Sequence, residues 1–318
     1  MRDLIISIII IYLVICFALG CKKQLKCTYY VFLVMGVTYL ILSICTGYIE
    51  LYNPKIYKIP SDRARGTDLT QLQDDESGGF RLVVSLSTLP SRLGGIKPVI
   101  ESILNGTVCP DGIYLNLPEY SKREGIEYKI TDELLNISPK LKINNTKDDY
   151  GPVTKLYPTL EQETDPETII ICIDDDIEYH PRLIETLLQS SQQYPDKCIC
   201  LSGWNYINLG NIMTLPLYFP YFFVRKVDIL QCYGGVLYKR KFFDNLSLFK
   251  KYMELTPCFT TDDITISKYL KERDIEIFMI PSSIKNKNLH RQKTSALSDF
   301  NTSNNQWIKC IKAEIDRS

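Results

Sequence analysis

An almost entirely apolar stretch at residues 169–173 ends abruptly in three consecutive carboxylates, Asp174, Asp175 and Asp176. A short apolar run that is bounded by charge is typical of a central strand in a parallel sheet, which is buried on both faces. Loops at the carboxyl ends of such strands are where open α/β sheets bind their ligands. This stretch therefore predicts an α/β fold and also the place of its site.

The three carboxylates predict a cation site. Adjacent carboxylates repel one another, so a folded protein normally holds them together only where a cation or donor groups neutralise them. Because side chains alternate along an extended chain, Asp174 and Asp176 are expected to face a metal, with Asp175 turned the other way toward a ribose or sugar hydroxyl. Ligands that are all oxygen fit Mn²⁺ or Mg²⁺ rather than zinc. The alternative is a solvated acidic turn ahead of a helix that starts near Pro181.

The segments around this stretch alternate between strand and helix patterns. Strands are expected at residues 81–86, 111–117, 141–144 and 169–173, and helices through residues 99–104 and 153–163. Strands that alternate with helices predict a doubly wound, mostly parallel sheet. We assign residues 80–295 to this α/β domain and residues 296–318 to a C-terminal helix or tail.

The N-terminal part of the chain predicts a membrane anchor. Residues 4–19 are apolar apart from Ser7, and residues 29–49 carry no charge. The second segment is long enough to cross a bilayer core of about 30 Å. We interpret residues 1–52 as a hairpin of two transmembrane helices, followed by a polar linker at residues 53–79. For the first segment, the core of a signal peptide is the alternative.

Two signals lean toward a cytoplasmic position for the large domain. In a hairpin the N-terminus and this domain share a side, and the Lys and Arg count on that side favours the cytoplasm. The cysteines outside the membrane segments are odd in number and lack zinc-ligand spacing, which agrees with a reducing compartment. Sequons for N-glycosylation occur at Asn105, Asn136, Asn144, Asn245 and Asn301. Several are expected by chance in so Asn-rich a chain, so they do not decide the side.

The charge composition argues against a nucleic-acid partner. Lys and Arg together number 37, as do Asp and Glu, so the chain has no net positive field. Nor does the sequence contain a local stripe of Lys and Arg with interleaved aromatic residues. We therefore expect no nucleic acid among the partners.

Several motifs, taken in order along the chain, resemble those of a known family. They are Ser-Leu-Ser-Thr-Leu-Pro-Ser-Arg at 85–92, Asp-Tyr-Gly-Pro-Val-Thr-Lys-Leu at 149–156, the Asp triplet, Gly-Gly-Val-Leu at 234–237 and Asp-Asp at 262–263. Their order and spacing resemble GT-A-fold glycosyltransferases, most closely family 2-like members such as those of large DNA viruses. The resemblance implies that residues 80–295 form a catalytic domain. Such a domain would transfer sugar, with inversion, from a nucleoside-diphosphate sugar to a hydroxyl on a glycan, lipid-linked or protein acceptor.

The resemblance also implies which residues bind the donor. Thr88 and Arg92 match the loop that holds the nucleotide base and ribose. The alternative for Arg92 is a surface arginine at the start of a helix. Lys155 follows a Gly-Pro turn at a helix start, where backbone N–H groups and a lysine suit a diphosphate; the alternative is a solvated surface lysine. Gly234 and Gly235 would let the backbone approach donor or acceptor closely, or would form a bulge between strands.

Metal ligands and a general base follow from the same resemblance. Asp176 matches the metal-binding residue, Asp174 would be a second or water-mediated ligand, and His290 would complete the site, unless it is an exposed loop histidine. Asp263 matches the general base, with Asp262 in support. Acidic residues at this place are also ordinary in the first turn of a helix.

Two rival functions remain open from the sequence. An aspartate-nucleophile phosphatase also places Asp-x-Asp after an apolar strand, but it requires Thr or Val where this chain has Glu178. A non-catalytic membrane scaffold with a decayed transferase domain is the other rival. The presence of the triplet, the 262–263 pair and Lys155 argues against decay.

Overall fold

The computed structural model describes residues 80–208, 212–215, 224–282, 284–289 and 297–313. The predicted transmembrane hairpin and its linker, residues 1–79, lie outside these ranges. Among the residues within them, no helix combines the length and apolar character needed to cross a membrane.

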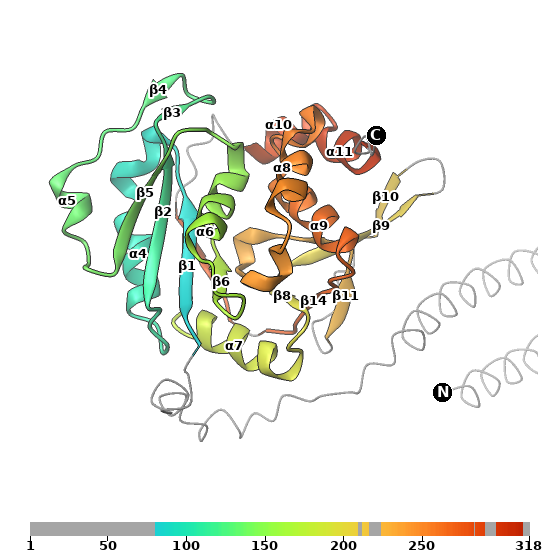
Figure 1. Cartoon of the computed structure of the whole chain (residues 1–318), viewed down its shortest axis with the longest axis horizontal. Helices are drawn as coiled ribbons and strands as arrows, with labels where there is room; N and C mark the ends of the chain where they lie inside the picture. The colour runs from blue at the N-terminus through green and yellow to red at the C-terminus, as the bar shows by residue number, and fades with distance from the viewer. Residues whose placement is uncertain (1–79, 209–211, 216–223, 283, 290–296, 314–318) are drawn as a thin grey trace, which may run out of the picture. The chain divides into compact units, whose positions relative to one another are not determined.

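A single large sheet forms the centre of the described domain (Figure 1). Its strands are β1 (Leu82–Ser87), β2 (Gly112–Pro118), β5 (Leu141–Thr146), β6 (Ile169–Cys172), β8 (Cys198–Cys200), β11 (Arg225–Val227), β13 (Val236–Lys239) and β14 (Ile277–Met279). They lie in the order β11-β14-β8-β13-β6-β1-β2-β5. Strands β6, β1, β2 and β5 are parallel, as are β14 and β8. The prediction of a mostly parallel sheet is confirmed, whereas β13 enters antiparallel between β6 and β8, and β11 pairs antiparallel with β14.

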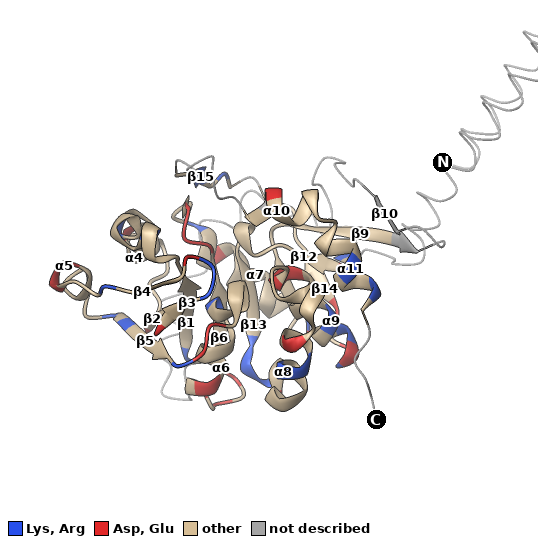
Figure 2. Ribbon diagram, turned by 90° about the horizontal axis from the view of Figure 1, so that it is seen from above, with Lys and Arg blue, Asp and Glu red and all other residues tan. Residues whose placement is uncertain are grey.

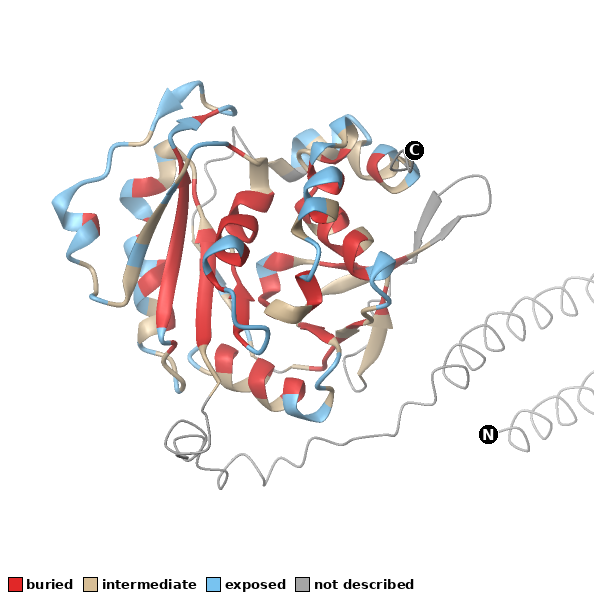
Figure 3. Ribbon diagram, viewed as in Figure 1, coloured by how far each residue is buried: buried red, intermediate tan, exposed pale blue. Residues whose placement is uncertain are grey.

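Helices cover both faces of this sheet, so the central strands are buried on both sides. Helices α4 (Lys97–Leu104) and α7 (Leu183–Gln193) pack on one face. Helices α6 (Tyr157–Gln162), α8 (Leu246–Glu254) and α9 (Asp262–Glu272) pack on the other. Figure 3 shows β1, β2 and β6 buried along their lengths. This burial explains why the run that forms β6 is so purely apolar.

The predicted helix at residues 153–163 is divided in two. Residues Gly151–Lys155 form the 3-10 helix η3, and α6 begins at Tyr157. Pro158 lies in the first turn of α6, where a proline ring is tolerated because no amide hydrogen is required there. A continuous helix would have placed this proline in its interior.

The smaller elements lie in the connections between these strands and helices and in the C-terminal segment. They are η2 (Pro90–Gly95), β3 (Tyr120–Ser121), β4 (Ile126–Glu127), α5 (Asp132–Leu135), β7 (Ile177–Glu178), β9 (Gly203–Asn208), β10 (Ile212–Leu215), β12 (Ile229–Leu230), η4 (Cys232–Gly234), η5 (Arg240–Phe243), η6 (Thr256–Cys258), β15 (Lys287–Asn288), α10 (Leu297–Ser303) and α11 (Gln306–Lys312). Figure 2 shows basic and acidic residues interspersed over these elements, in keeping with their equal numbers.

A disulfide between Cys258 and Cys310 ties the C-terminal helix α11 to η6, just ahead of α9. The segment predicted as a helix or tail thus forms helices that are fastened to the domain. The cross-link joins residues 52 apart in sequence, for which chain-entropy arguments give about 4 kcal/mol of stabilisation. Disulfides persist in oxidising compartments, but the other described cysteines are free, so the side of the membrane stays a prediction.

Candidate active site

The predicted site lies at the carboxyl end of β6, and the three carboxylates occupy the turn that leads into β7. The alternation predicted for them does not hold, because β6 ends at Cys172 and the turn is not extended. Asp175 and Asp176 both lie near Arg92 Nη1, at 3.2 and 3.8 Å, while Asp174 turns to Lys155. Protein cations and donors therefore neutralise the triplet.

Thr88, Arg92 and Asp175 form one cluster. Thr88 Oγ1 donates to Asp175 Oδ2 at 2.6 Å, and Arg92 Nη1 reaches the other oxygen at 3.2 Å. Pro90 starts η2 directly after β1 and so turns Arg92 back over the strand end. The Tyr128 hydroxyl donates to the Thr88 carbonyl at 2.7 Å, which fastens the segment after β4 to this loop. The cluster can present one carboxylate and one guanidinium to a polar ligand.

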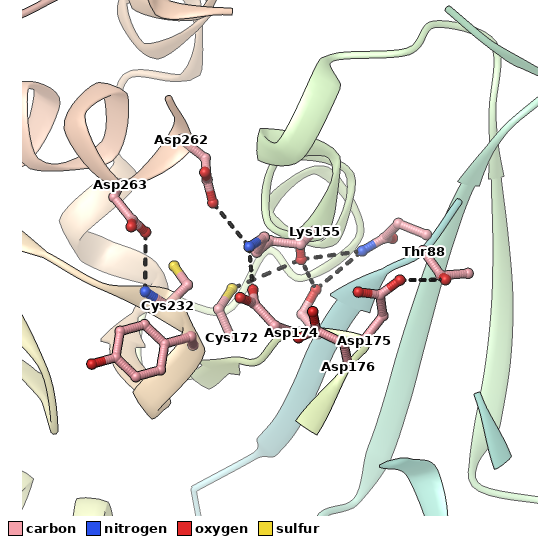
Figure 4. Close-up of polar contacts among 12 residues, drawn as sticks. Thr88, Lys155, Cys172, Asp174, Asp175, Asp176, Cys232, Asp262 and Asp263 are labelled. Atoms are coloured by element: carbon pink, nitrogen blue, oxygen red, sulfur yellow. Dashed lines mark hydrogen bonds and ion pairs between the residues drawn. The ribbon is translucent and has the colours of Figure 1, made fainter. Parts of the chain in front are cut away.

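Lys155 is buried, with 8% of its surface exposed, and is not the solvated lysine of the alternative interpretation. Its Nζ donates to Asp174 Oδ1 and lies 2.9 Å from Asp262 Oδ2 (Figure 4). The Asp262 oxygen lacks hydrogen-bond geometry, so that contact is an ion pair. Burial alone lowers the pKa of Lys155, but the two carboxylates outweigh it and hold the pKa well above its ordinary value. Lys155 therefore joins the triplet to the start of α9.

A buried polar network holds the Lys155 backbone, and sequence reasoning missed it. Ser85 Oγ donates to the Lys155 carbonyl, and Asn116 Nδ2 donates to Ser85 Oγ and to Thr159 Oγ1 at 3.0 Å each. Ser85, Asn116 and Thr159 are fully buried. A polar residue inside each of two otherwise apolar strands could have indicated this network, because buried polar groups require hydrogen-bond partners.

Asp263 is held from the opposite side by the turn η4. Its Oδ1 accepts a hydrogen bond from the Cys232 N–H at 3.0 Å, and the side chain is partly exposed (Figure 4). Burial and the neighbouring charge of Asp262 raise the pKa of Asp263, against the opposing effects of Lys155 and the Cys232 N–H. Thr261 makes no side-chain cap of α9 and instead donates to the Cys258 carbonyl. Asp262 and Asp263 nevertheless lie in the first turn of α9, as the capping alternative expects, so the role of Asp263 as base stays a prediction.

The glycines near the site have internal packing reasons. Gly235 has φ of 95°, and a Cβ there would lie 2.9 Å from Leu183 Cδ1. A Cβ on Gly234 would lie 3.1 Å from Ser202 Cβ. Their approach to a donor or acceptor stays a prediction. Gly151, with φ of 63°, has the same role at η3, since its Cβ would meet the Phe259 carbonyl at 2.5 Å.

The carboxylates of the triplet turn fit a hard divalent cation, because they offer oxygen alone. His290, predicted to complete the metal site, lies outside the described residues, but the Leu289 N–H donates to the Asp176 carbonyl at 2.9 Å. In a second group, formed by Cys232, Asp262 and Asp263, the candidate ligand atoms all lie within 4.8 Å of one another. It fits a metal less well, because burial raises the pKa of the Cys232 thiol and keeps it protonated.

Comparisons with known proteins address the fold. No family model matches the sequence, and no curated protein matches it. A crystal structure of GalNAc-T7 with UDP, GalNAc and Mn²⁺ is similar, with a TM-score of 0.50 and 12% sequence identity. The alignment covers 75% of this chain and 48% of that chain, so the chain spans about half the length of that protein. The described domain has the GT-A fold of this glycosyltransferase.

Proposed function

We propose that the chain is a metal-dependent, inverting glycosyltransferase that transfers a sugar from a nucleoside-diphosphate sugar to an acceptor hydroxyl. The observation that carries the proposal is the pair of ionic contacts that Lys155 makes with Asp174 and Asp262. Through them the triplet at the sheet edge is linked to Asp262, which directly precedes Asp263. A cation site and a basic carboxylate are the two groups that such a transfer requires. The GT-A fold supports this assignment.

Each part of the site has a role in the proposed reaction. Thr88, Arg92 and Asp175 bind the nucleoside, and Asp174 and Asp176 would hold Mn²⁺ or Mg²⁺. The cation supplies Lewis-acid stabilisation of the departing diphosphate. Asp263 takes the proton of the acceptor hydroxyl as that oxygen bonds to the anomeric carbon and the bond from this carbon to the diphosphate breaks.

Nucleotide-sugar cleavage by the full chain tests the proposal. With UDP-sugars, chosen first because the similar structure contains UDP, release of UDP is expected only with Mn²⁺ or Mg²⁺. The Asp176→Asn variant is expected to need a much higher metal concentration to reach the same rate. The control is Asp299→Asn, which changes an exposed acidic residue of α10 and should behave as wild type. Full turnover in excess chelator would refute the metal requirement.

The rate of transfer is expected to rise with pH across the neutral range. Burial beside Asp262 raises the pKa of Asp263 to about 8, and the base form is the deprotonated one. The acid limb of kcat/KM should therefore lie well above the ordinary carboxylate range, and activity should be lost as pH falls through the raised pKa. Donor affinity, measured over the same pH values, should lack this limb. A midpoint below pH 5 would contradict the assignment.

We also propose that residues 1–52 anchor the chain in a membrane by two passes. The charge count favours a cytoplasmic domain, and the Cys258–Cys310 disulfide favours the oxidising side. We give more weight to the disulfide, because the charge difference is small. In sealed vesicles whose cytoplasmic face is outward, added protease should then spare residues 80–318 until detergent is added. Cleavage before detergent would assign the domain to the cytoplasm.

A further inference from the structure

The turn η4 connects the two halves of the site. The Cys232 N–H holds Asp263, and the Tyr233 carbonyl accepts a hydrogen bond from the Tyr179 hydroxyl at 3.2 Å. That hydroxyl accepts in turn from the N–H of Asp174 at 2.8 Å. The backbone of Tyr233 therefore lies between the triplet and the carboxylate proposed as base.

The ring of Tyr233 is exposed and also fixed. Its residue surface is 44% exposed, and its hydroxyl lies 2.8 Å from Ser202 Oγ. The same Oγ donates to Gln231 Oε1 at 2.8 Å, and the Gln231 N–H donates to the Ser202 carbonyl at 2.9 Å. Gly234 packs closely on Ser202. The turn thus holds a partly exposed aromatic ring without the rotamer freedom that an exposed tyrosine usually retains.

Other exposed large hydrophobic residues of the described domain lie on other elements. Tyr120, Ile126, Ile130 and Leu135 belong to the segment from β3 to α5, and Phe300 belongs to α10. Within the described ranges, Tyr233 alone among them is next to the residue whose N–H holds Asp263. Core packing does not explain an exposed ring at this place.

We propose that Tyr233 is the platform on which a pyranose ring of the acceptor stacks, so that the acceptor is a sugar; this inference rests on the proposed function. A pyranose has a face of C–H groups and an edge of hydroxyls. Stacking buries the C–H face on an aromatic ring and leaves the edge free to reach Asp263.

The charges around the turn favour a neutral acceptor over a phosphorylated one. The polar side chains beside the ring are Ser202 and Gln231, a hydroxyl and an amide that suit sugar hydroxyls. Among the residues that the structure describes, the carboxylates joined to the turn are Asp263, through the Cys232 N–H, and Asp174, through Tyr179, while Lys155 is enclosed by Asp174 and Asp262. A phosphate on the acceptor would be repelled here.

The test uses the full chain with metal, a nucleotide sugar that it cleaves, and methyl pyranosides of glucose, galactose, mannose and N-acetylglucosamine as acceptor probes. At least one probe should accelerate nucleoside-diphosphate release and yield a disaccharide. Tyr233→Ala and Tyr233→Leu should raise the KM for that probe by about tenfold, as expected for loss of one aromatic stacking contact, with little change in the donor KM. Tyr233→Phe keeps the ring and should have a smaller effect. Phe300→Ala, which removes another exposed aromatic residue, should leave the probe KM unchanged.

The outcomes separate this inference from the function on which it rests. If the chain cleaves the donor but no pyranoside accelerates cleavage, the sugar acceptor is refuted and the transferase proposal stands. If the probe KM is unchanged in both Tyr233→Ala and Tyr233→Leu, Tyr233 is not the platform. A chain that neither binds nor cleaves any nucleotide sugar overturns both proposals.

Discussion

Asp263→Asn is expected to lower kcat for sugar transfer by about 10³-fold, within the range that general-base catalysis contributes. The amide keeps an oxygen that can accept the Cys232 N–H, so the geometry at η4 should persist. It cannot take the proton of the acceptor hydroxyl. Because the donor is held by other residues, its dissociation constant should stay close to that of wild type, as measured by calorimetry without acceptor.

Two further variants make this result specific. Asp262→Asn should act mainly through Lys155, whose ion pair it weakens, and should lower stability together with the rate. Asp299→Asn changes a carboxylate in the first turn of α10 and should affect neither. Transfer at the normal rate by Asp263→Asn would eliminate this residue as the base and leave Asp262 as the carboxylate to examine.

The strands of the central sheet were predictable because each is a local signal. The apolar runs at 81–86, 111–117 and 169–173 match β1, β2 and β6 closely, since strands buried on both faces have few polar residues. Strand β13 carries a similar apolar signal, but its antiparallel place between β6 and β8 is set by pairing across the whole domain. Local pattern contains no information on that partner.

The sequence indicated residues that the structure brings together, but it did not indicate their contacts. Motif spacing indicated Lys155 and the pair at 262–263 separately, as a phosphate-binding lysine and a base. Their ion pair depends on the close packing of Gly151 against Phe259, which brings η3 and the start of α9 together. The Cys258–Cys310 disulfide was out of reach for a similar reason, because spacing alone does not determine which cysteines pair.

Lys155→Met is expected to destabilise the domain by about 3–5 kcal/mol, the usual cost of removing one partner from a buried ion pair. Methionine retains the apolar stem but leaves Asp174 and Asp262 facing each other without a cation. Urea denaturation at neutral pH, with the free energy of unfolding taken from the midpoint and slope, measures the loss.

The double variant Lys155→Met/Asp262→Asn tests the cause of this destabilisation. If the loss arises from uncompensated charge, neutralising Asp262 should recover part of it, so that the double variant is more stable than Lys155→Met alone. Additive losses would contradict the charge argument.

Stabilisation by saturating donor tests whether Lys155 contacts the diphosphate, which is the role that the sequence predicted. If it does, Lys155→Met should reduce the stabilisation that saturating donor gives. If Lys155 only positions Asp174 and Asp262, the variant should be less stable without donor, while the stabilisation that donor adds should stay close to that of wild type.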